Sequence, residues 1–87
     1  MMKGKTSSGF EYQIDENTLD DMRLLDLIVE VAEGDLTKIS HVADRVLGKQ
    51  KEELYKHLEG KDGRVSIKKV SDEITEIFSQ GNAGKNS

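Results

Sequence analysis

The chain has 87 residues, a formal net charge of −4, and no cysteine, tryptophan or proline. A chain of this length makes one small domain with a thin core, and the missing cysteines exclude disulfides and thiolate chemistry. No apolar run approaches the roughly 20 residues that span a bilayer, and the first residues lack the apolar stretch of a signal peptide. We therefore expect a cytoplasmic protein without a membrane partner.

The charges are distributed unevenly along the chain. Residues 11–35 contain nine acidic residues and one basic residue, which gives −8, whereas residues 36–69 contain nine basic and five acidic residues, which gives +4. Such a charge dipole could steer a partner toward the protein or promote self-association. Two ordinary solvated helix faces explain the same pattern.

A short strand is predicted near the N-terminus. Residues 10–15 alternate apolar and polar side chains, which is the period of a half-buried strand. This strand must pair with residues 1–8, with another copy or with a partner, and residues 3–8 could form the other half of a weak hairpin. Residues 1–8 are otherwise expected to be flexible, as is the tail of residues 80–87, because both segments have little to bury. Residues 9–79 are expected to form a single helical domain.

The first predicted helix is unusually apolar. It runs from about Leu19 to Glu33, with Asn17 or Thr18 as the N-cap and Gly34 as the residue that ends it. Its apolar positions cover more than one face. The helix is therefore either central to the core or exposes an apolar stripe to solvent.

Three further helices are predicted, over about residues 36–47, 49–59 and 67–78. Asp35 is the expected N-cap of the first of these and Ser66 that of the last, and single glycines end the first two. The predicted fold is mainly α: a small bundle of about four helices with a short N-terminal β-strand or hairpin.

No group of residues has the spacing of a catalytic or metal site. Asp62-Gly63 resembles the turn of a calcium loop, but the flanking positions do not supply the ligands. His41 and His57 lack partners at the spacing of a zinc site. A serine–lysine spacing that begins at Ser66 is explained by helix capping. We expect a protein that is not an enzyme and that has no cofactor, no metal and no small-molecule substrate.

A DNA-binding regulator is the first alternative. Residues 37–58 predict a helix, a glycine and a second helix, which is the outline of a helix-turn-helix. Against this interpretation, Glu52 and Glu53 lie on the would-be recognition helix, arginine is scarce and the chain is acidic overall, so no nucleic-acid partner is expected. The side chains that could face phosphates or bases are Lys49, Gln50, Lys51, Lys56 and His57.

Several short motifs follow one another in a recognisable order. They are Ser8-Gly-Phe10-Glu-Tyr12-Gln-Ile14-Asp15, Leu19-Asp-Asp21-Met22-Arg23-Leu-Leu25, Gly34-Asp35, Leu47-Gly48, His57-Leu58, Asp62-Gly63-Arg64-Val65 and Ile74-Thr-Glu-Ile77. Over residues 8–78, this order resembles the small tail assembly chaperones of long-tailed bacteriophages (siphophages), especially those of Gram-positive hosts.

The resemblance implies a transient role in building a phage tail. Such proteins coat the long helical tape measure protein while the tail tube is built around it, and they are displaced as tube subunits arrive. The chain would then be the short, non-frameshifted product, present in the bacterial host cell and absent from the mature virion. Its partner would be the tape measure protein, with the tail tube protein as a second candidate. A structural head-tail or virion protein remains the second alternative.

Binding an amphipathic helix requires exposed apolar surface. The strand and the off-stripe positions of the first helix are the predicted sources of this surface, and the fourth helix is a further one. For each position, packing in the core is the competing role. The predicted protein-binding residues are Phe10, Tyr12, Ile14, Leu24, Leu27 and Val31.

Overall fold

The N-terminal segment forms a β-hairpin. β1 (Met2–Lys5) pairs antiparallel with β2 (Glu11–Ile14), and the turn is closed by a 2.9 Å hydrogen bond from Thr6 N to Phe10 O. The computed structural model describes the backbone of residues 1–85 and the side chains of residues 1–81. The hairpin alternative is therefore correct. The prediction that residues 1–8 are loose is wrong, because β1 supplies the backbone partner that β2 needs.

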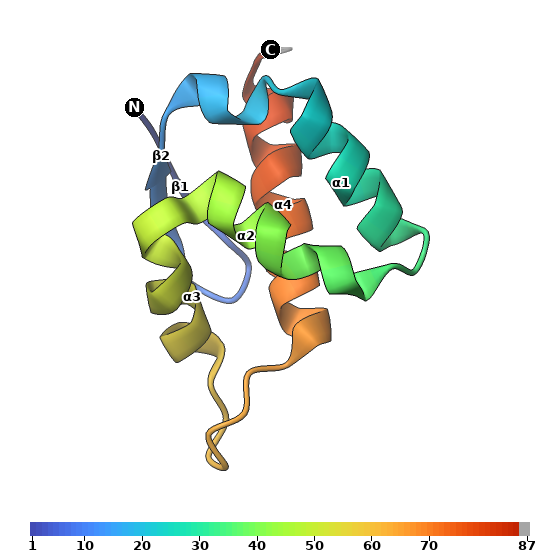
Figure 1. The fold of residues 1–87 in the computed structure, drawn as a ribbon. Helices are drawn as coiled ribbons and strands as arrows, with labels where there is room; N and C mark the ends of the chain where they lie inside the picture. Colours follow the sequence, from blue (N-terminus) through green and yellow to red (C-terminus); the bar gives the residue numbers. More distant parts are fainter. Residues whose placement is uncertain (86–87) are drawn as a thin grey trace.

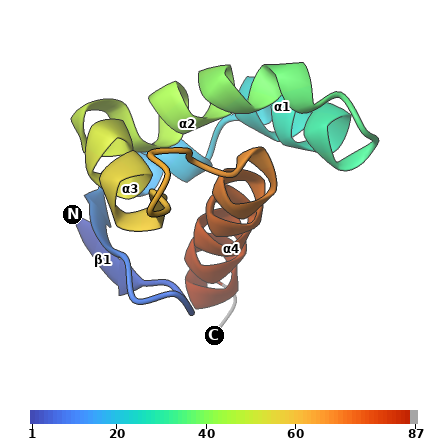
Figure 2. The ribbon, with the colours of Figure 1, turned by 90° about the horizontal axis from the view of Figure 1, so that it is seen from below.

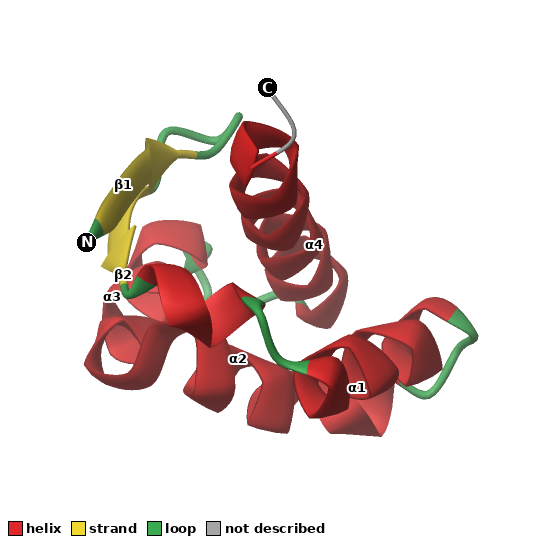
Figure 3. Cartoon of the chain, turned by 90° about the horizontal axis from the view of Figure 1, so that it is seen from above, coloured by secondary structure: helices red, strands yellow, loops and turns green. Residues whose placement is uncertain are grey.

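Four α-helices follow the hairpin in the described residues, so the prediction of a mainly helical fold with an N-terminal hairpin is confirmed (Figure 1). Figures 2 and 3 show α1 (Met22–Ala32) and α2 (Ile39–Leu47) in one layer, with α4 (Ile67–Lys85) and the hairpin on the same side of that layer. The core fills the space between them. Its largest fully buried side chains are Leu24, Val42, Leu54, Ile74 and Ile77.

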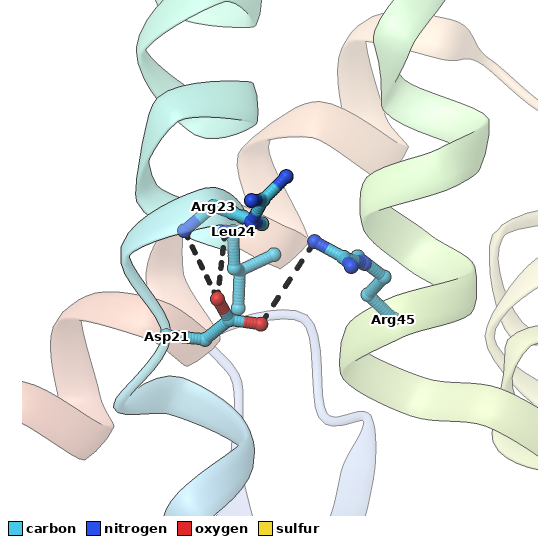
Figure 4. A network of polar contacts seen from close by, with 4 residues as sticks. All are labelled: Asp21, Arg23, Leu24 and Arg45. Atoms are coloured by element: carbon cyan, nitrogen blue, oxygen red, sulfur yellow. Dashed lines mark hydrogen bonds and ion pairs between the residues drawn. The ribbon is translucent and has the colours of Figure 1, made fainter.

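The first helix begins later than predicted. Residues Glu16–Leu19 form a separate 3₁₀ turn, and α1 starts after Asp21, whose Oδ1 accepts from the backbone N of Arg23 at 2.9 Å and of Leu24 at 3.4 Å. Figure 4 shows the same carboxylate facing Arg45 of α2, with 3.8 Å between Oδ2 and Nη1. Asp21 is thus the cap of α1 in place of Asn17 or Thr18, and the same carboxylate also faces α2.

The middle helices are shorter than predicted at their N-termini, where the chain forms 3₁₀ turns. The turn Leu36–Lys38 precedes α2, and the turn Gly48–Gln50 precedes α3 (Lys51–Leu58). Asp35 is a cap, as predicted, but of the 3₁₀ turn and not of α2: its Oδ1 accepts from the backbone N of Thr37 at 3.2 Å, whereas α2 begins after Lys38 without a side-chain cap. Such 3₁₀ turns are common at helix ends.

The last helix is longer than predicted. Its Ser66 cap is confirmed by a 3.2 Å hydrogen bond from Lys69 N to Ser66 Oγ. The helix then continues to Lys85. Residues 80–85 of the predicted flexible tail over 80–87 therefore belong to α4, and residues 86–87 lie outside the described part. Within that part, no helix is both long enough and apolar enough to cross a membrane.

Candidate functional site

The side chains predicted to bind a partner lie mostly inside the protein. Leu24 is fully buried and Val31 is 7% exposed, so the off-stripe positions of α1 face the core. Leu27 packs against the core and is partly buried. These positions of α1 therefore do not form an open apolar stripe, which agrees with the competing role in the core. The strand residues are also in the core: Phe10, Tyr12 and Ile14.

The acidic residues of α1 explain which of its two apolar faces is buried. Its inner face carries Leu24, Ile28 and Val31, whereas the opposite face carries Met22 and Val29 between acidic side chains. Burying the second face would remove carboxylates from water, which costs several kcal/mol for each unpaired charge. The helix therefore turns its acid-free face inward, although both faces are apolar enough to be a core stripe.

An apolar groove lies where the start of α2, the middle of α3 and the start of α4 meet. Its volume is about 310 Å³, and Thr37 and Ser40 line part of its edge. We call it the α2–α4 groove. Its apolar and aromatic lining consists of Leu36, Ile39, Tyr55, Val65, Ile67 and Val70.

Two large aliphatic side chains of this groove are open to solvent. Leu36 is 44% exposed and Ile67 is 57% exposed, whereas Val70 is buried. Large aliphatic side chains that stay exposed around a concave apolar surface are typical of a binding site. The α2–α4 groove is therefore the candidate functional site of the described residues.

Helix caps place both exposed side chains. Asp35 accepts hydrogen bonds from the backbone N and the hydroxyl of Thr37, which fixes the 3₁₀ turn that begins at Leu36. The hydroxyl bond is the main reason why the pKa of the Asp35 carboxyl lies below its ordinary value. At the other side, the Ser66 cap stands between Val65 and Ile67 and fixes the first turn of α4. Local capping chemistry thus sets the positions of the groove edges.

The aromatic wall of the groove is supported from α2. Lys51 Nζ lies 2.7 Å from Asp44 Oδ1 and 5.9 Å from the ring centroid of Tyr55. The hydrogen bond to Asp44 is the main cause that raises the pKa of Lys51 above its ordinary value. Lys51 therefore stays charged beside the Tyr55 ring, a geometry that favours a cation–π contact.

A second cluster brings together a serine, a histidine and a glutamate from distant parts of the chain. Ser8 Oγ donates to Glu73 Oε1 at 2.7 Å, and His57 Nε2 lies 3.1 Å from both Ser8 Oγ and the Ser8 carbonyl oxygen. No sequence signal predicted this cluster, because its members come from the hairpin turn, α3 and α4.

The order of contacts in that cluster differs from a nucleophilic triad. In a triad, the carboxylate orients the imidazole, and the free imidazole nitrogen accepts the serine proton. Here the carboxylate of Glu73 holds the Ser8 hydroxyl directly. The Ser8 carbonyl oxygen can only accept, so the hydrogen bond between it and His57 requires a proton on Nε2. A protonated Nε2 has no free lone pair and cannot accept the proton of the Ser8 hydroxyl. The cluster therefore fastens the hairpin turn to the helices.

The helix-turn-helix interpretation loses much of its proposed DNA-facing surface. The side chain of Gln50 pairs with the backbone of Gln13, with Oε1 accepting from Gln13 N at 2.9 Å and Nε2 donating to Gln13 O at 2.5 Å. Lys51 pairs with Asp44, and His57 is held by the hairpin turn. Three of the five side chains named for that role are therefore engaged within the protein.

Comparison with protein-family models, with curated proteins and with solved structures found no match. The resemblance of residues 8–78 to phage tail assembly chaperones therefore depends on the order of sequence motifs alone. Among the described residues, no group of three or more histidine, cysteine, aspartate or glutamate side chains is placed to hold a metal ion.

Proposed function

We propose that this protein is a non-enzymatic assembly chaperone that binds an amphipathic helix of a longer protein in the α2–α4 groove. The observation that carries the proposal is the groove itself, with Leu36 and Ile67 exposed at an otherwise apolar surface. An amphipathic helix presents apolar side chains at i, i+3, i+4 and i+7, which suits such a groove.

The order of motifs supports one partner in particular, the tape measure protein of a long-tailed phage. In this role the protein acts in the cytoplasm of the host cell, keeps the long helices of that protein soluble, and leaves as the tail tube grows. The tail tube protein is a second candidate partner, and self-association of the chaperone along the tape measure protein belongs to the same proposal.

A chaperone that must leave needs modest affinity at each site. Covering two half-exposed aliphatic side chains contributes about 1 kcal/mol each. Many copies on one long partner still hold the partner in solution, because repeated weak contacts act together. A small open groove therefore suits a transient role better than a deep pocket would.

Co-expression with the tape measure gene of the same phage tests the proposal. The measurement is the soluble fraction of the tape measure protein with the wild-type chain, with Ile67→Glu, and with Thr75→Glu as a matched control at an exposed position of α4. We expect the wild type and Thr75→Glu to raise that fraction and Ile67→Glu to lose the effect. If the wild type gives no increase, the chaperone role is wrong; if Ile67→Glu acts like the wild type, the groove is not the site.

Two further measurements address the alternatives. A gel shift with random duplex DNA at low salt tests DNA binding, and a shift at micromolar protein would favour a regulator over a chaperone. Mass spectrometry of purified phage particles tests a structural role. A chaperone is absent from finished tails, so stoichiometric amounts of the chain in the particles would contradict the proposal.

A further inference from the structure

The outer face of α1 carries an apolar stripe that the described residues leave open. Met22, Leu25, Val29 and Ala32 follow one another at intervals of three, four and three residues, which is the spacing of a coiled-coil seam. Met22 is 66% exposed and Val29 is 44% exposed, Ala32 is also exposed, and Leu25 is partly buried. Both Figure 1 and Figure 2 show α1 at the edge of the molecule, on the opposite side from the hairpin.

Three acidic side chains accompany this stripe. Asp26 and Glu33 each directly follow a stripe residue, Glu30 lies one turn along from Asp26, and all three are exposed. Within residues 1–81, none of these carboxylates forms an ion pair or a side-chain hydrogen bond. Asp21 and Asp44, by contrast, are paired with cations of the same chain. The outer face of α1 thus keeps its negative charges available.

The charge around this face selects the kind of partner that fits it. Residues 11–35 carry a net −8, so an acidic helix would be repelled from the stripe. Lysine or arginine beside the seam of an incoming helix would instead meet carboxylates, as charged residues beside the seam do in coiled coils. A basic amphipathic helix therefore has the shape and the charge that complement the outer face of α1.

We propose that the outer face of α1 is a second docking surface, for an amphipathic helix of another protein whose seam packs on the Met22–Ala32 stripe. Lysine and arginine side chains of that helix pair with Asp26, Glu30 and Glu33. This surface is separate from the α2–α4 groove, and the inference does not depend on the groove being a binding site. A chain with both surfaces holds two helical segments at once.

Two synthetic helical peptides with the same apolar seam test the proposal, one with lysine and one with glutamate at the flanking positions. Fluorescence anisotropy measures their binding to the wild-type protein and to the double variant Asp26→Lys/Glu33→Lys. We expect the wild type to bind the lysine peptide roughly tenfold tighter than the glutamate peptide. The preference reverses in the double variant, and added salt weakens both favourable combinations.

The controls separate this surface from the groove and from self-association. Ile67→Glu should keep the wild-type preference for the lysine peptide over the glutamate peptide, because that preference arises at α1 and not at the groove. Equal binding of both peptides to the wild type, or an unchanged preference in the double variant, would overturn the proposal. So would a concentration-dependent oligomer that disappears in the double variant without any peptide binding, since the face would then join copies of this chain.

Discussion

Gly81 of α4 lies directly against Leu19 of the first 3₁₀ turn. A Cβ atom built on Gly81 would overlap Cδ1 of Leu19 and come within 3.0 Å of the terminal methyl of Met2. The last turns of α4 therefore approach both the hairpin and the segment before α1 so closely that only a glycine fits. Gly81 lies in the part of α4 that extends beyond the predicted helix end, so the contact places that extension against the rest of the fold.

Gly81→Ala should destabilise the protein. In an exposed helix this change adds about 1 kcal/mol of stability, because alanine is the better helix former. Here the new methyl group overlaps a buried leucine, and overpacking of this kind costs about 1–3 kcal/mol. Urea unfolding followed by circular dichroism measures the difference, with Ser79→Ala as the control at an exposed position of the same helix. A Gly81→Ala protein that is as stable as Ser79→Ala would show that α4 does not pack here.

Glu73 should matter far more than its neighbour Asp72. Glu73 is 6% exposed, and its Oε1 accepts hydrogen bonds from the Thr6 and Ser8 hydroxyls, each at 2.7 Å. Glu73→Ala leaves the buried Thr6 hydroxyl without this acceptor, which costs about 1–3 kcal/mol. Among the side chains that the structure describes, Asp72 contacts only Lys68, in an exposed ion pair, so Asp72→Ala should change stability by less than about 0.5 kcal/mol.

Amide hydrogen exchange gives the second readout for Glu73. We expect the hairpin amides, that of Phe10 among them, to exchange faster in Glu73→Ala, because the turn loses its buried attachment to α4 and keeps only the exposed contacts of Ser7 with Glu76 among the described residues. Equal stability losses for Glu73→Ala and Asp72→Ala, with unchanged exchange in the hairpin, would contradict the fastening role.

Local chemistry made part of this fold predictable. The strict alternation of residues 10–15 predicted the strand, and the Ser66 cap predicted the start of α4 that the structure confirms. The Asp35 cap predicted where the helical backbone begins, although its first residues form a 3₁₀ turn before α2. Each of these signals acts over a few residues. The start of α1 was missed because Asn17, Thr18 and Asp21 are all good caps, and the choice among them depends on where Leu19 and Arg45 lie in the fold.

The candidate site was less predictable than the fold. The predicted residues Leu24 and Val31 are in the core. The helix α1 has two apolar faces, and the cost of burying its acidic side chains determines which face packs inward. Leu36 and Ile67 were not among the predicted binding residues, although the fourth helix was named as a further source of exposed apolar surface. Their exposure results from the way in which α2, α3 and α4 meet, which no single-helix pattern contains.

The Asp21 cap should contribute more to stability than the ion pair it makes. Asp21→Ala removes the acceptor for two backbone N–H groups at the start of α1, and the loss of such a cap costs about 1 kcal/mol. Arg45→Ala removes only a 3.8 Å contact between partly exposed groups and should cost less than about 0.5 kcal/mol. Thermal unfolding of both variants, with Asp20→Ala as the control, measures the two effects. A larger loss for Arg45→Ala would show that the ion pair dominates.

The stability of the protein should decrease at high pH because of Tyr12. Burial is the main cause that raises the pKa of Tyr12 above its ordinary value of 10.0, and the negative charge of Glu76 raises it further. The folded state therefore holds the phenol proton more tightly than the unfolded state does. The resulting stability is complete below about pH 10 and is lost as the pH rises through the higher pKa of the folded protein.

Tyr12→Phe isolates this contribution. The variant loses the hydrogen bond from the Tyr12 hydroxyl to Gln80 Oε1, so it should be less stable at neutral pH by about 1 kcal/mol. Above pH 10 the free energy of unfolding of Tyr12→Phe should fall less steeply than that of the wild type, because the variant has no phenol at position 12 to titrate. Lysine deprotonation is common to both proteins and does not contribute to the difference. Urea unfolding at a series of pH values measures the two slopes, and ultraviolet absorbance follows tyrosinate formation. Parallel stability curves for the two proteins would mean that Tyr12 titrates alike in the folded and unfolded states.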